Sequence, residues 1–126
     1  MTGNSPLFRH ERLEVWRRAQ GYARSIRDLR RAFPAEERFG FVSQLRRASG
    51  SISHNITEGN GRETVRDKCR FLQIAYGSLL ETVSQLSLAV EFDILTFDQV
   101  RPLREEAAEI ARMITGLRRR YERDGH

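Results

Sequence analysis

The chain has 126 residues, of which 39% are hydrophobic and 31% are charged, and its formal net charge is +5. This length suits one domain with a single core. No run of roughly 18 apolar residues occurs, which excludes a transmembrane span, and we expect no secretory signal because the first residues lack an apolar segment. The single cysteine, Cys69, rules out an internal disulfide framework, fits a reducing cytoplasm and is predicted to be a semi-buried apolar residue.

Almost all of the positive charge is arginine, since Lys68 is the only lysine. The planar guanidinium group of arginine favours bidentate contacts to carboxylate or phosphate. A GC-rich genome also produces arginine in place of lysine through codon bias alone. An isoelectric point near 10.3 therefore raises the expectation of a nucleic-acid or acidic partner only modestly.

Residues 1–9 are predicted to be a flexible lead-in to a single domain over residues 10–123. A first helix is predicted over residues 10–32, with Arg17, Arg24 and Arg27 among the residues on its outer side. Its expected inward row is Leu13, Trp16, Ala19, Ala23, Ile26 and Leu29. Phe33-Pro34 should end this helix, because the residue before a proline is pushed out of the helical region.

A second helix is predicted over residues 35–58, since proline and acidic residues suit a first helical turn. Its inward row follows steps of three and four, at Val42, Leu45, Ser49, Ile52 and Ile56. A polar row is predicted to turn away from that side, at Gln44, Arg47, Ser51, Asn55 and Glu58. Gly59-Asn60-Gly61 is predicted to stop the helix, because glycine readily adopts the left-handed conformation.

A third helix is predicted over residues 64–92, with an inward row of Leu72, Ala75, Leu79, Thr82, Leu86 and Ala89. Gly77 costs this helix roughly 0.5–1 kcal/mol relative to alanine, which predicts close approach of a neighbouring helix. Thr96 and Gln99 form a capping-box pattern, so a fourth helix should begin there. Its inward row is Val100, Leu103, Ala107, Ile110, Ile114, Leu117 and Tyr121. Four such helices with short connections predict an all-α, antiparallel up-down-up-down four-helix bundle.

No residue pattern predicts catalysis. His54 and Glu58 would share a helical face but offer a metal only two ligands, so we expect an ion pair or cap there. The serines near His54 are too close in sequence to meet it in nucleophile–base geometry. Residues 59–61 lack the spacing and the lysine of a phosphate-binding loop. We therefore expect a protein that is not an enzyme, with no cofactor and no metal site.

Polar residues beside the apolar rows suggest a structural network, because a carboxylate near a core needs donors or a cation. The predicted members are Ser51, Asn55, Glu58 and Glu81. Asn55 and the end of the second helix would donate to Glu81 and so fix the helix register, or the set would hold a ligand.

Basic residues gather around the second and third helices, and we predict that they contact nucleic-acid phosphates. They are Arg46, Arg47, Arg62, Arg66 and Arg70. The alternative is a solvated face that Glu58, Glu63 and Asp67 balance. No aromatic-rich platform for single-stranded bases stands out in the sequence.

Several motifs resemble those of a known family: LEVWRRA at 13–19, FP at 33–34, the run from Glu37 through FGFVSQLRRASGSISHNITEG, and RFLQIAYGSLLE at 70–81. They resemble the small bacterial four-helix-bundle proteins called 23S rRNA intervening-sequence proteins, over roughly residues 13–117. Thr57 departs from the alanine that the family often has. The matching positions are Gln44, Arg46, Arg47, Ser51, Asn55, Glu58, Gly59, Gly77, Ser78 and Glu81.

The resemblance implies a cytoplasmic bundle that assembles as a ring-like homo-oligomer, a pentamer, and it implies no known activity. The chain is also similar to the accessory bundle protein of diversity-generating retroelements, which binds nucleic acid and reverse transcriptase. Apolar residues outside the predicted core leave a second face for subunit contact, namely Phe39, Phe41, Tyr76, Leu80, Leu88 and Phe92.

Two functional hypotheses follow from the sequence. The first is a non-enzymatic, homo-oligomeric bundle that binds RNA or DNA through its arginine-rich surfaces. The alternative is a protein–protein scaffold that recognises an acidic partner without nucleic acid.

Overall fold

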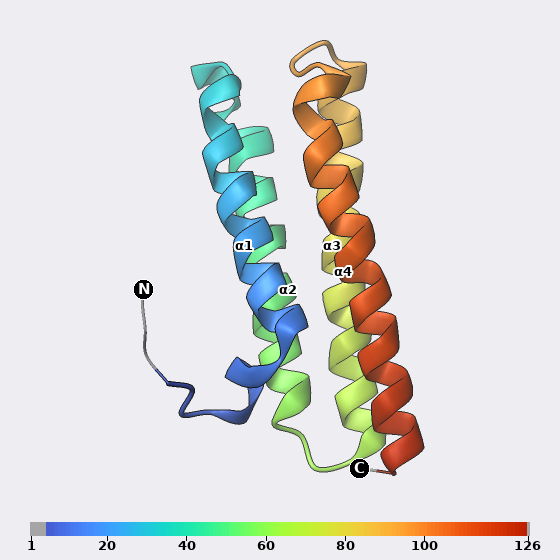
Figure 1. Cartoon of the computed structure of the whole chain (residues 1–126). Helices are drawn as coiled ribbons and strands as arrows, with labels where there is room; N and C mark the ends of the chain where they lie inside the picture. Colours follow the sequence, from blue (N-terminus) through green and yellow to red (C-terminus); the bar gives the residue numbers. More distant parts are fainter. Residues whose placement is uncertain (1–4, 126) are drawn as a thin grey trace.

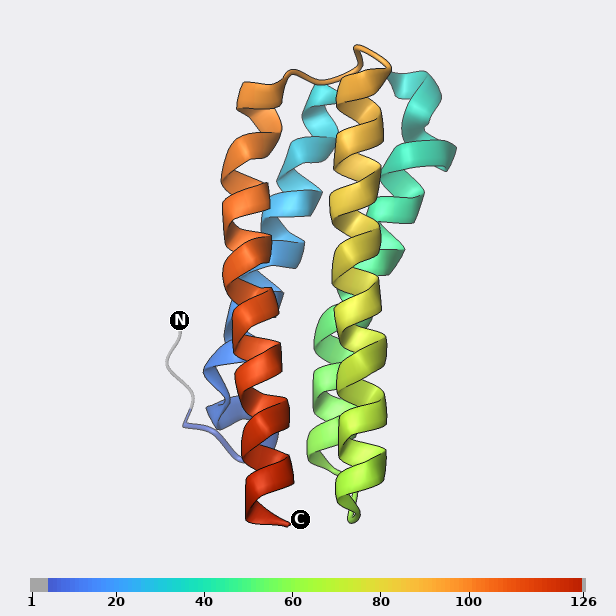
Figure 2. The same ribbon diagram turned by 90° about the vertical axis from the view of Figure 1, so that its right-hand side faces the viewer.

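A computed structural model describes residues 5–125 and confirms the predicted all-α four-helix bundle (Figure 1). The helices are α1 (Glu14–Leu29), α2 (Ser43–Asn60), α3 (Val65–Glu91) and α4 (Phe97–Asp124). Successive helices run antiparallel, so the α1–α2 and α3–α4 connections lie at one end and the α2–α3 turn at the other (Figure 2). No strand occurs among residues 5–125.

The core is built from one apolar row of each helix, as the steps of three and four predict. The rows of α3 and α4 are buried at every predicted position. Leu45, Ser49, Ile52 and Ile56 of α2 are buried too, while Val42 is half-buried against the core. Cys69 is buried, more fully than the semi-buried position predicted for it.

The row predicted for α1 is wrong in part. Val15 and Tyr22 are buried there, whereas Trp16 and Ala23 are only half-buried. Tyr22 takes the central place because its hydroxyl group meets Thr82 Oγ1 of α3 at 2.8 Å, which satisfies a polar atom in the core. Trp16 instead lies edge-on to His10, with ring centroids 4.9 Å apart.

The first helix is also shorter than predicted. Leu13 has extended backbone angles and separates α1 from a short 3₁₀ turn, η1 (Arg9–Arg12). The Glu11 carboxylate accepts hydrogen bonds from the backbone N–H groups of Leu7 and Phe8, and these bonds lower the pKa of Glu11. The predicted lead-in falls partly on residues 1–4, which lie outside the described residues.

The α1–α2 connection is irregular where the sequence predicts a regular helix from residue 35. Two 3₁₀ turns, η2 (Arg30–Ala32) and η3 (Ala35–Glu37), precede a π-helical turn, η4 (Arg38–Val42). Buried Phe33 stacks on Phe41, which in turn packs edge-on against Phe92 beside the α3–α4 turn. Aromatic contacts therefore hold together both connections at this end of the bundle.

The role predicted for Gly59 is wrong. Gly59 lies inside α2, which ends at Asn60, and the capping residue Gly61 has a right-handed φ of −84°. A Cβ atom on Gly59 would stand 3.0 Å from the backbone oxygen of Lys68 and 3.2 Å from Phe71 Cβ. Gly59 is therefore the residue that lets α2 and α3 approach closely.

The close approach predicted at Gly77 is absent within the described chain, since no atom lies within 4 Å of a Cβ built there. The predicted cap of α4 is confirmed: Gln99 N–H donates to Thr96 Oγ1, and Thr96 N–H donates to Gln99 Oε1 at 2.8 Å. Among the described helices, none is long and apolar enough to cross a membrane.

Candidate nucleic-acid interface

A basic groove lies at the end of the bundle where α1 connects to α2. It has a volume of about 640 Å³, and we call it the α1–α2 groove. Its floor is apolar and includes buried Phe33 and half-buried Val42. Four arginines line it, one each from α1, η2, η4 and α2: Arg27, Arg30, Arg38 and Arg46. Phe39, from the π-helical turn, completes the lining and is 88% exposed.

The groove continues along the outer side of α2. A second depression of about 590 Å³ shares Ser43 and Arg46 with it and adds Arg47, Gly50 and His54. Arg46 and Arg47 are both exposed. The structure therefore places two of the predicted phosphate-binding residues in one continuous basic surface.

This surface lacks compensating acids. No aspartate or glutamate lines either depression. Among residues 5–125, no carboxylate lies within ion-pairing distance of the five arginines, Arg27, Arg30, Arg38, Arg46 and Arg47. Arg30 donates only to a backbone oxygen, that of Arg27, at 2.8 Å. Unneutralised guanidinium groups beside one another attract a polyanion more strongly than paired ones.

The other predicted arginines lie at the opposite end of the bundle, and two of the three have an acid within ion-pairing distance. Arg62 donates to Glu58 Oε1 at 2.9 Å, and Arg70 lies 3.9 Å from Asp67 Oδ1. Both guanidinium carbons stand 4.6 Å from the centroid of the Phe71 ring, which holds them by cation–π attraction. Arg66, like Arg70, belongs to α3, and it is exposed.

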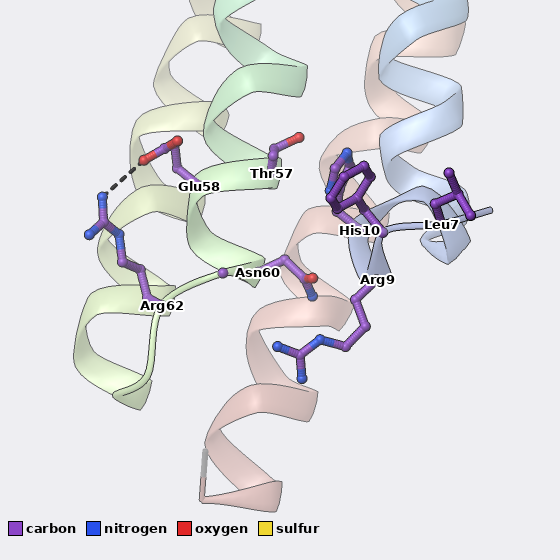
Figure 3. Close-up of a pocket in the computed structure, with 9 residues that line it drawn as sticks. Leu7, Arg9, His10, Thr57, Glu58, Asn60 and Arg62 are labelled. Carbon is purple, nitrogen blue, oxygen red and sulfur yellow. Dashed lines mark hydrogen bonds and ion pairs between the residues drawn. The ribbon is translucent and has the colours of Figure 1, made fainter.

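A cleft of about 590 Å³ near Arg62 lies between the N-terminal residues and the end of α2 (Figure 3). Arg9, His10 and Asn60 line it, and Figure 3 shows Arg62 turned toward Glu58. The cleft therefore contains two arginines, Arg9 and Arg62, and Glu58 neutralises the charge of Arg62.

Lys68, beside this cleft, serves the fold. Its buried ammonium group donates to the backbone oxygen of Asn60 at 3.0 Å and lies 4.9 Å from the Tyr121 ring centroid. Asn60 Nδ2 donates to Tyr121 Oη at 2.9 Å. Burial of the ammonium group, with Arg9 nearby, lowers the pKa of Lys68. These contacts cap the end of α2 and join it to α3 and α4.

The five predicted arginines do not form the single cluster that the sequence predicts, because Arg46 and Arg47 lie apart from Arg62, Arg66 and Arg70. Ser51 of α2 lies level with Ser78 of α3, because their hydroxyl groups are 2.8 Å apart. Arg47 precedes Ser51 by one turn, and Arg70 lies two turns from Ser78 in the opposite direction. At 1.5 Å per residue, Arg47 and Arg70 are about 18 Å apart along the bundle axis.

The predicted polar network exists in part. Asn55 Nδ2 donates to Ser51 Oγ at 2.9 Å, and Ser51 meets Ser78, so the polar row of α2 borders α3 instead of facing away from it. The prediction that Glu58 and Glu81 are shielded from solvent is wrong, since both are exposed. Glu58 pairs with Arg62 one turn away, which satisfies its carboxylate locally.

Among the described residues, no group of three or more histidine, cysteine, aspartate or glutamate side chains is placed to hold a metal ion. Cations, an apolar floor and an exposed ring meet in the α1–α2 groove, and unlike the cleft near Arg62 its lining contains no acid.

Comparison with known proteins identifies the family. The sequence profile of the 23S rRNA-intervening sequence protein family matches residues 11–116. The chain belongs to this family. No protein with a curated description matches it. A solved structure with a TM-score of 0.76 is 24% identical, and the match covers 83% of this chain and 95% of the other. That structure is of a protein with unknown function from the S23 ribosomal protein family of Bacteroides thetaiotaomicron, and the likeness supports the fold.

The groove lies wholly within the part that matches the 23S rRNA-intervening sequence protein profile. Sequence reasoning missed Arg27, Arg30, Arg38 and Phe39 as candidate site residues. A signal was present, because residues 38–57 contain no aspartate or glutamate although the chain has 17 acidic residues. Arginines in such a stretch have no acid one helical turn away to neutralise them.

Proposed function

We propose that this 23S rRNA-intervening sequence family member is a non-enzymatic, cytoplasmic, homo-oligomeric bundle that binds nucleic acid. The observation that carries the proposal is the acid-free lining of the α1–α2 groove and its extension to Arg47. Guanidinium groups suit phosphate recognition because they donate two parallel hydrogen bonds to its oxygens. Arg62 and Arg70 contribute less in this proposal, since Glu58 and Asp67 already balance them.

Fluorescence anisotropy with labelled structured RNA and duplex DNA, titrated across salt concentration, tests the proposal. We expect affinity to fall steeply with salt, because each neutralised duplex phosphate contributes about 0.9 to the log–log slope. The double variant Arg46→Gln/Arg47→Gln should reduce the slope on duplex DNA by about 1.8. Helical content should not change, since both side chains are exposed.

A matched control is Arg119→Gln/Arg120→Gln, which removes the same charge from exposed positions at the far end of α4. We expect this variant to bind nearly as the wild type does. Equal weakening by both double variants would show that only net charge matters and would contradict a site in the groove. Absence of binding even at low salt would contradict the function. A protein partner that is still captured in a pull-down from nuclease-treated lysate would then favour the protein scaffold.

The self-association in this proposal is supported by the outer face of α3. Ile74, Leu80 and Leu88 are 42–50% exposed along this face, and Gly77 leaves open space between them. Of the residues predicted for a second face, Phe41 and Tyr76 are instead half-buried against the core. We expect a pentamer by light scattering coupled to size-exclusion chromatography. Leu80→Glu should lower the mass, whereas Gln20→Glu on the exposed side of α1 should not.

A further inference from the structure

Phe39 is the exposed one of the three phenylalanines in the α1–α2 connection. It is 88% exposed, although Phe33 and Phe41 in the same connection pack inward. The π-helical turn η4 carries it outward beside Arg38, whose guanidinium carbon lies 5.9 Å from the ring centroid. π-helical turns are rare, and those that do occur are often found at functional sites. Phe39 therefore presents a free aromatic face beside cations.

The groove beneath Phe39 is apolar as well as basic. Phe33, Pro34 and Val42 form part of its lining, and a smaller depression beneath it reaches Ile26 and Leu45 of the core. Phosphates alone need cations and gain nothing from an apolar floor. A ligand that combines negative charge with flat apolar surfaces would use both parts of the lining.

We propose that the α1–α2 groove binds single-stranded nucleic acid, with one base stacked on Phe39 and the adjoining phosphates on Arg38 and Arg46. This inference rests on the proposed function and names the form of nucleic acid that the site takes. Proteins that bind single strands combine a positively charged groove with aromatic side chains on which bases stack. In a duplex the bases are stacked on one another, so Phe39 adds nothing to duplex binding.

The test compares four labelled ligands by anisotropy: oligothymidylate, an abasic DNA strand of equal length, oligouridylate RNA and duplex DNA. Phe39→Ala should weaken binding of oligothymidylate and oligouridylate by about 5- to 150-fold, which is the usual contribution of one stacked base. Binding of the abasic strand and of the duplex should not change. The salt slope should not change either, because no cation is removed. Phe39→Trp should retain the affinity, since a larger ring stacks at least as well.

Phe97→Ala is the matched control. Phe97 is 54% exposed, and the guanidinium carbons of Arg101 and Arg104 lie 5.6 and 5.9 Å from its ring centroid, yet it lies outside the groove. We expect this variant to bind all four ligands as the wild type does. An equal loss with Phe97→Ala would show that any exposed ring suffices and would overturn the assignment.

The remaining outcomes separate this inference from the proposed function. Undiminished oligothymidylate binding by Phe39→Ala overturns base stacking while nucleic-acid binding stands. Equal weakening on the abasic strand overturns it too, because the ring would then act without a base. A change in assembly mass with intact nucleic-acid binding would assign Phe39 to a subunit contact instead. If the wild type binds none of the four ligands, the proposed function itself fails.

Discussion

Replacing Gly59 with alanine tests whether the α2–α3 approach limits the stability of the bundle. The new Cβ would lie 3.0 Å from the Lys68 backbone oxygen and 3.2 Å from Phe71 Cβ, both inside ordinary van der Waals separation. Overpacking of this kind costs about 1–3 kcal/mol. Alanine returns about 0.5–1 kcal/mol of helix propensity, because Gly59 is already helical. We therefore expect the free energy of unfolding to fall, by up to about 2.5 kcal/mol.

Gly50→Ala provides the comparison that isolates the packing effect. Gly50 lies in the same helix, and no atom stands within 4 Å of a Cβ built there. This variant should gain about 0.5–1 kcal/mol from propensity alone. The propensity contributions cancel between the two variants, so their difference in unfolding free energy measures the clash, about 1–3 kcal/mol.

Urea denaturation followed by circular dichroism, at one protein concentration for both variants, gives this difference. Equal stability of Gly59→Ala and Gly50→Ala would refute the close-approach argument. It would mean that α3 shifts away at no measurable cost.

Further predictions concern the core hydroxyl pair and the surface. Burial of Tyr22 raises its pKa to about 12, so the stability that this shift provides is complete below pH 10 and is lost as the pH rises through about 12. Denaturation measured from pH 9 to 12 should show a decline on the order of 2–3 kcal/mol, and Tyr22→Phe should flatten it. At neutral pH, Tyr22→Phe should cost about 1 kcal/mol, because Thr82 keeps its bond to the Leu79 backbone oxygen. Glu58→Gln should change the free energy of unfolding by less than about 1 kcal/mol in low salt, since its ion pair is exposed. A larger loss would contradict the view that this pair is a weak surface interaction.

The sequence predicts the helices well because apolar spacing depends only on local geometry. In α3 and α4 the predicted rows with steps of three and four are buried throughout. In α1, apolar residues occur in adjacent pairs, Val15 with Trp16 and Tyr22 with Ala23, so spacing leaves the rotation of the helix open. The choice is made by the bond from Tyr22 to Thr82, a residue 60 positions away. Such a partner has no signature in local sequence.

The predicted burial of a polar side chain is wrong where an oppositely charged residue lies one helical turn away. Glu58 stands near an apolar row on a helical wheel, which suggested burial, yet Arg62 lies four residues away and holds it at the surface. The role predicted for Gly59, as part of a helix stop, is wrong for a related reason. A glycine near a helix end is most often a stop signal, and only the position of the Lys68 backbone, on the next helix, shows that it serves close packing.

The same short-range pairing explains why the basic surface lies where it does. Most ion pairs in the described chain join residues three or four apart, such as Glu14 with Arg18 and Glu109 with Arg112. The arginines in these pairs are therefore neutralised by an acid of their own helix. Residues 38–57 contain no acid, so Arg38, Arg46 and Arg47 have no such partner, and the fold adds Arg27 from α1 and Arg30 from η2 beside them. Net charge alone would distribute nucleic-acid binding over the whole surface, whereas this local absence of acids would concentrate it in the α1–α2 groove. The two double-arginine variants distinguish these outcomes.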